Sequence, residues 1–156
     1  MATSKPTIST SFLYETLEET LDVKPLGAKL HIGIPKETAF QENRIALTPE
    51  AVGVLVSNGN EVSIEHLAGE GSHYSDADYS EAGANIVFDR HEIYKCPILV
   101  KSAPIVSEDL PLLQLNQIII SPIHYSALQQ ADIQKMMEKK ITALSFENFK
   151  DASGTY

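Results

Sequence analysis

Six short apolar runs dominate the sequence from residue 30 onward, at residues 30–34, 61–66, 84–88, 97–101, 117–121 and 141–146. Helix-like segments lie between several of these runs, at residues 49–59, 76–83, 90–95, 107–113 and 126–140. Strands that alternate with helices are typical of βαβ units, in which the strands pair in parallel. We therefore predict an α/β fold. It has a mostly parallel sheet flanked by helices, in the three-layer arrangement of Rossmann-like and flavodoxin-like domains.

Helix-capping residues support this reading. Thr48 precedes Pro49, which places an N-cap hydroxyl before proline at the first helical position. Gly59 follows the last apolar residue of the same segment, where a left-handed glycine commonly ends a helix. Ser75 and Asp78 have the spacing of a capping box, with aspartate in place of glutamate. These signals predict helices that begin near residues 49 and 76.

The composition changes at both ends of the regular pattern. Residues 1–27 are rich in serine and threonine and then acidic, and we interpret them as an N-terminal extension. Residues 28–150 contain the strand and helix pattern and form the predicted domain. Residues 151–156 carry turn signals and are interpreted as the start of a linker, so we expect the chain to be the front part of a longer protein.

The net charge bears on which kinds of partner the protein can bind. The formal net charge is −9 over 156 residues, which argues against a nucleic-acid backbone or an anionic membrane as the partner. A single cysteine excludes an internal disulfide and indicates a reducing compartment. The sequence has no apolar run long enough to span a membrane and no secretory signal at its start. We expect a cytoplasmic protein with a small-molecule substrate.

The opening loop, residues 35–48, carries the first candidate site. It joins the first strand to the first helix, and in a parallel sheet such loops line the ligand-binding edge. Arg44 has a planar fork of donors that can hold a carboxylate in a bidentate manner. The charge pattern alone favours an ordinary ion pair of Arg44 with Glu37 or Glu42, because structural ion pairs outnumber ligand clamps.

Two more candidates follow later strands. His124 lies between an apolar strand and a helix, and histidine is the natural proton carrier near neutral pH. Lys101 directly follows the apolar residues 97–100, at the carboxyl end of a predicted strand, where a lysine can polarise a substrate carbonyl. The other histidines are scattered, and we expect no metal site.

The opening loop resembles the start of the N-terminal domain shared by alanine dehydrogenases and the nucleotide-binding subunit of proton-translocating transhydrogenases. The matching residues are Gly33, Ile34, Pro35, Glu37, Glu42, Arg44, Ile45, Ala46, Thr48 and Pro49. The later stretch "NGNEVSIEHLAGEGSHYSDADYSEAGANIV" is similar to further motifs of this family. The resemblance covers residues 30 to 156, and an ordered series of motifs is more specific than any one of them.

The resemblance implies an NAD-dependent, reversible oxidative deamination of L-alanine to pyruvate and ammonia. Arg44 matches the family's arginine that clamps the substrate carboxylate, with Glu37 and Glu42 as supports that aim it. His124 matches the proton donor and acceptor, and Lys101 is the lysine that would bind the carbonyl oxygen. NAD would be bound by a Rossmann domain beyond residue 156, since this chain has no dinucleotide fingerprint. The resemblance also implies a homo-oligomer, and the fragment alone should not turn over.

Three alternatives remain open at this point. A transhydrogenase subunit shares the Ala103-Pro104 pair, although that branch usually has tryptophan at the position of His124. A related saccharopine or lysine-forming dehydrogenase also uses a lysine and histidine pair. A non-catalytic binding module of the same fold is the last alternative, because Lys101 is shifted by one residue against the family pattern.

Overall fold

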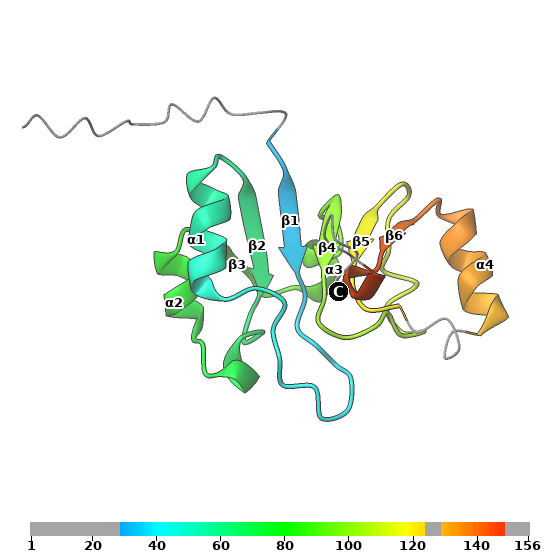
Figure 1. Ribbon diagram of the computed structural model, residues 1–156, viewed down its shortest axis with the longest axis horizontal. Coiled ribbons are helices and arrows are strands. Elements are labelled where there is room, and N and C mark those ends of the chain that lie inside the picture. The colour runs from blue at the N-terminus through cyan, green and yellow to red at the C-terminus, as the bar shows by residue number, and fades with distance from the viewer. Residues whose placement is uncertain (1–28, 124–128, 149–156) are drawn as a thin grey trace, which may run out of the picture.

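A computed structural model describes residues 29–123 and 129–148 of the chain (Figure 1). The strands are β1 (His31–Ile34), β2 (Glu61–Glu65), β3 (Asn85–Val87), β4 (Ile98–Val100), β5 (Ile118–Ile120) and β6 (Thr142–Leu144). The helices are α1 (Pro49–Ser57), α2 (Asp76–Glu81), α3 (Arg90–Ile93) and α4 (Gln130–Glu138), with short 3-10 turns at Glu70–Ser72 and Phe146–Asn148. All six predicted strands are present, and the predicted α/β fold is confirmed. Within the described ranges, no helix is both long enough and apolar enough to cross a bilayer.

The strands form one sheet in the order β3-β2-β1-β4-β5-β6, and every neighbouring pair is parallel. This is the strand order of the Rossmann arrangement, rather than that of the flavodoxin-like alternative. The order reverses between β1 and β4, which pair directly with each other. In open parallel sheets, the crevice at this switch point is where ligands bind, outside the carboxyl ends of the strands.

Capping residues set the helix starts as the sequence indicated. Thr48 Oγ1 accepts a hydrogen bond from the backbone of Ala51 at the start of α1. Ser75 and Asp78 make the reciprocal bonds of a capping box at the start of α2. Gly59 ends the turn after α1 with a φ of 86°, a left-handed conformation that glycine adopts without a steric penalty. Local sequence signals therefore determine where α1 and α2 begin and where the turn after α1 ends.

The two faces of the sheet carry different residues because side chains alternate along a strand. Ile34, Val62 and Ile64 face α1 and α2 and are fully buried or nearly so. Gly33 and Leu99, which are paired across β1 and β4, face the opposite side, where α3 packs. A Cβ atom at Gly33 would lie 2.8 Å from Cys96 Cβ, so a side chain there would push the end of α3 away.

One predicted helix is absent. Residues 107–112 form a series of turns, although the segment 107–113 was predicted to be helical. Pro111 has no N–H to donate, which disfavours a regular helix in so short a segment. The side chain of Asp109 bonds the backbone N–H of Val106 and then turns towards the interior, where it is 1% exposed. This correction matters because Asp109 becomes part of the site.

The last predicted helix is shorter than expected. The sequence pattern covered residues 126–140, and α4 begins at Gln130 and ends at Glu138. Part of the difference falls on residues 124–128, which lie outside the described ranges.

Candidate functional site at the carboxyl edge of the sheet

The carboxyl edge is the edge of the sheet at which the parallel strands end. The arrowheads of β1 and β2 point to it in Figure 1, and the opening loop extends beyond it. The opening loop and the segment after β2 enclose a polar cleft of about 360 Å³. The cleft is lined by Lys36, Glu37, Ala39, Gln41, Glu42, Asn43, Arg44, Leu67, Ala68, Glu70 and Gly71. Three of the predicted site residues, Glu37, Glu42 and Arg44, therefore lie at one cleft beside the switch point.

Arg44 and Glu42 form a fork at the rim of this cleft. Arg44 Nε donates to Glu42 Oε1 at 2.9 Å, and Nη2 donates to Oε2 at 2.6 Å. The Arg44 side chain is nevertheless 75% exposed. The hydrogen bonds from the Arg44 side chain and backbone lower the pKa of Glu42 to about 2, so its carboxylate stays ionised. Arg44 therefore already holds one carboxylate in a bidentate grip while most of its surface stays open to solvent.

The far wall of the cleft depends on Gly71. A Cβ atom there would lie 2.8 Å from the backbone oxygen of Asn43, closer than real Cβ contacts. Next to it, Ser72 Oγ donates to the same Asn43 oxygen at 2.8 Å. The turn at residues 68–72 therefore passes close to the opening loop. This contact fixes the backbone directly before Arg44.

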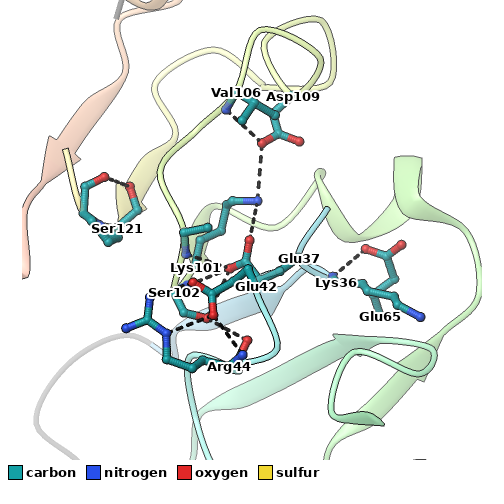
Figure 2. A network of polar contacts seen from close by, with 12 residues as sticks. Lys36, Glu37, Glu42, Arg44, Glu65, Lys101, Ser102, Val106, Asp109 and Ser121 are labelled. Atoms are coloured by element: carbon teal, nitrogen blue, oxygen red, sulfur yellow. Dashed lines mark hydrogen bonds and ion pairs between the residues drawn. The ribbon is translucent and has the colours of Figure 1, made fainter. Parts of the chain in front are cut away.

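Lys101 lies in a different environment. It follows β4 directly, and its side chain is 1% exposed. Its Nζ is 3.0 Å from Glu37 Oε2 and 3.3 Å from Asp109 Oδ2 (Figure 2). Two carboxylates from segments far apart in sequence therefore compensate the buried charge.

Glu37 joins the opening loop to the end of β4. Its Oε1 accepts the backbone N–H groups of Ser102 at 2.7 Å and Ala103 at 3.1 Å. Its Oε2 faces Lys101 as an ion pair and accepts no hydrogen bond from the described residues. We predicted that Glu37 and Glu42 aim Arg44. Glu42 is the direct partner of the Arg44 side chain, and Glu37 forms its ion pair with Lys101.

Asp109 is the second carboxylate beside Lys101. Its Oδ1 accepts from Tyr94 Oη at 2.6 Å and from Arg90 Nη2 at 2.9 Å, and its Oδ2 accepts the backbone N–H of Val106 at 3.3 Å. Burial by itself would raise the pKa of Asp109. The charge of Lys101 and these hydrogen bonds outweigh burial, so the pKa is lowered and the group stays ionised.

Arg90 extends the network to β2 and the opening loop. Its Nη1 donates to the backbone oxygen of Lys36 at 3.0 Å and to Glu65 Oε2 at 3.1 Å. Glu65 Oε2 in turn accepts the backbone N–H of Lys36 at 2.8 Å. The charges therefore alternate in sign along Glu65, Arg90, Asp109, Lys101 and Glu37.

The sequence reasoning missed part of this network. Arg90, Tyr94 and Asp109 were not singled out, because they lie in predicted helices and their charges have no short-range pattern. The one available signal was Pro111, two residues after Asp109, which interrupts a segment too short for a regular helix. His124, the predicted proton carrier, lies outside the described residues.

Cys96 lies at the opposite edge of the sheet, where β4 begins. It immediately precedes β4, is 2% exposed, and its Sγ is 3.4 Å from His31 Nε2. Burial raises the pKa of its thiol, which disfavours the reactive thiolate. Cys96 is therefore a core residue that takes no part in the site.

Comparison with known protein families identifies the domain. The family described as alanine dehydrogenase/PNT, N-terminal domain, matches residues 33–155. The chain belongs to this family. Over 116 residues it is 34% identical to an alanine dehydrogenase of Staphylococcus saprophyticus, a stretch that covers 74% of this chain and 31% of the relative. It is 32% identical over 126 residues to an alanine dehydrogenase of Staphylococcus epidermidis, covering 81% of this chain and 34% of the relative.

Solved structures agree with this family assignment. The fold is similar to that of an L-alanine dehydrogenase with a TM-score of 0.76 and 30% sequence identity, over 81% of this chain and 35% of the other. A transhydrogenase from Sinorhizobium meliloti has the same fold, with a TM-score of 0.68 and 24% identity over 75% of this chain and 35% of the other. The chain thus spans about a third of the length of the relatives it matches.

Proposed function

We propose that the chain is the substrate-binding part of an NAD-dependent alanine dehydrogenase, which converts L-alanine reversibly to pyruvate and ammonia. Family membership and similarity to alanine dehydrogenases support this proposal. The observation that carries it is the exposed fork of Arg44 at the rim of a polar cleft beside the switch point. A homo-oligomer with a cytoplasmic location belongs to the same proposal.

Arg44 would bind the substrate carboxylate. It already makes two parallel N–H···O bonds to Glu42, which is the geometry that a free carboxylate would require. The guanidinium remains 75% exposed, so a ligand can approach it without unfolding the loop. Holding the carboxylate at one end orients the reacting carbon, and orientation can lower a barrier by several kcal/mol.

Lys101 and His124 would act on the reacting end of the substrate. The Lys101 charge lies between Glu37 and Asp109, so its electric field is fixed before a substrate arrives. A fixed cation stabilises the negative charge that develops on a carbonyl oxygen. His124 would give and take the proton, since imidazole titrates near neutral pH.

The opening loop and the residues that line this cleft do not fit NAD. The opening loop separates β1 from α1, so no helix N-terminus follows β1 directly to receive a pyrophosphate. The loop lacks the Gly-x-Gly-x-x-Gly pattern, and Glu37, Glu42 and Glu70 line the cleft. NAD would therefore be bound mainly by residues outside this chain.

Kinetics of two Arg44 variants in the full-length protein test the proposal. Arg44→Lys keeps the charge and loses the fork, so kcat/KM for pyruvate should fall about 10-fold or more, which corresponds to 1.4 kcal/mol. Arg44→Met should lower it further. Lys95→Met is the matched control, because Lys95 is also an exposed cation paired with a carboxylate, Glu92, and lies outside the cleft lining. If both Arg44 variants kept the kcat/KM of the control, Arg44 would not be the clamp.

One observation favours a second candidate, a non-catalytic binding module. Lys101 is 1% exposed and held by two carboxylates, as in a structural ion network. Titration of the full-length protein with pyruvate and NADH separates the two functions. Ammonia-dependent oxidation of NADH supports the dehydrogenase, and binding without oxidation supports the module.

A further inference from the structure

Asp109 is a fixed negative charge next to Lys101. Arg90, Tyr94 and the backbone of Val106 donate hydrogen bonds to it, and together they engage both of its oxygens. The carboxylate is 1% exposed and therefore cannot turn towards solvent. Its Oδ2 lies 3.3 Å from Lys101 Nζ. The position of this charge is thus set by groups other than the lysine.

Glu37 by itself does not determine where the lysine amino group lies. Its Oε2 is 3.0 Å from Lys101 Nζ but accepts no hydrogen bond from the described residues, so the contact between them is electrostatic. The flexible four-carbon stem of lysine allows Nζ to move around a single carboxylate. A second, immobile carboxylate on the other side removes that freedom.

Stability alone does not explain such a network. Burying charged groups is costly, and an apolar group of similar volume often serves the fold equally well. Buried ionisable groups whose pKa is shifted, as that of Asp109 is, are enriched at functional sites. The network lies between β1 and β4, at the switch point where a ligand would bind.

We propose that Asp109 is a positioning residue for the dehydrogenase reaction and that it sets the location of Lys101 Nζ relative to the substrate carbonyl. The inference rests on the proposed function of Lys101. The charged groups that face this lysine are Glu37 from the opening loop and Asp109 from the turn after β4. Behind Asp109, Arg90 and Tyr94 of the α3 region hold the carboxylate in place.

Three variants of the full-length protein test this inference by kinetics. Asp109→Asn should lower kcat for pyruvate reduction about 10- to 100-fold, since a small misplacement near the reacting centre can cost a factor of about 100. The KM for NADH should not change. Asp109→Glu restores the charge, so kcat should recover in part. The recovery in log kcat should be at least a third of the drop that Asp109→Asn causes. Asp132→Asn is the matched control: Asp132 is also a buried aspartate, it accepts a hydrogen bond from Ser107, and it has no contact with Lys101. Its kcat should stay within about 2-fold of wild type.

A spectroscopic measurement keeps the test independent of turnover. In protein labelled with ¹³C at the lysine ε carbon, a held Lys101 side chain gives two distinct Hε signals, and Lys101→Met assigns them. Asp109→Asn should merge the two signals, and Asp132→Asn should leave them separate. The positioning role would be overturned if Asp109→Asn left the two signals unchanged. It would also be overturned if Lys101→Met were inactive and Asp109→Asn had the same kcat as Asp132→Asn. An active Lys101→Met would refute the proposed role of the lysine itself, and the spectra would still report whether Asp109 holds it.

Discussion

Arg44 and Lys101 carry the same charge beside the same switch point, in opposite surroundings. The Arg44 side chain is 75% exposed and the Lys101 side chain is 1% exposed. Arg44 is paired with Glu42, two residues away in the opening loop. Lys101 is paired with Glu37 and Asp109, which come from two separate segments.

This difference separates the two tasks of the site. The ion pair of Arg44 and Glu42 contributes little to stability, because water competes with Glu42 for the exposed guanidinium. A buried pair is costly to break, because the remaining charge has no solvent to stabilise it. We propose that the exposed fork exchanges Glu42 for a ligand. The buried lysine instead links the opening loop to the segment after β4.

The largest expected effect is that of removing the buried charge. Lys101→Met would remove the ion-pair partner of Glu37 and one of the two cations that pair with Asp109, so the free energy of unfolding should fall by about 3–5 kcal/mol. Arg44→Met should lower it far less, because solvent screens the exposed guanidinium. Urea denaturation of the chain with each substitution measures both values. Equal stabilities of the two variants would break the comparison, because burial would then not distinguish the two cations.

A smaller effect is expected from the wall of the cleft. Gly71→Ala would place a Cβ atom 2.8 Å from the Asn43 backbone oxygen, and such overpacking costs about 1–3 kcal/mol. Gly53→Ala is the control, because Gly53 lies within α1 with its nearest neighbour at 4.0 Å. That substitution should stabilise the chain by about 0.5–1 kcal/mol. Thermal unfolding measures the two opposite shifts, and a stabilising Gly71→Ala would refute the close contact.

The smallest effect concerns the exposed fork and its pH dependence. The pKa of Glu42 is lowered to about 2, so its contribution to stability is present above the ordinary pKa of 4.5 and is lost as the pH falls through about 2. Titration of the Glu42 carboxyl group followed by NMR should show a midpoint near pH 2. In Arg44→Met the midpoint of Glu42 should rise towards the ordinary value. Asp78 is the control, since its pKa is lowered by hydrogen bonds from Ser75 and should not respond to Arg44.

The exposed fork was predictable from the sequence, and the buried cluster was not. Arg44 and Glu42 are close neighbours in one loop, so a charge pattern suffices to suggest their pairing. Apolar alternation and caps likewise located β1, α1 and β2, because these signals are local. The surroundings of Lys101 depend instead on contacts between distant segments, including one that was predicted to be a helix. Sequence periodicity contains no information on which side chains such turns bring together.

Glu37 has a consequence for recombining this domain with its relatives. It belongs to the opening loop, yet its carboxylate is bound to the backbone of Ser102 and Ala103 and to the side chain of Lys101. A chimera with its breakpoint between α1 and β4 would take Glu37 from one parent and Lys101 from the other. The opening loop and the segment from β4 to Asp109 therefore need to come from the same parent in any chimera.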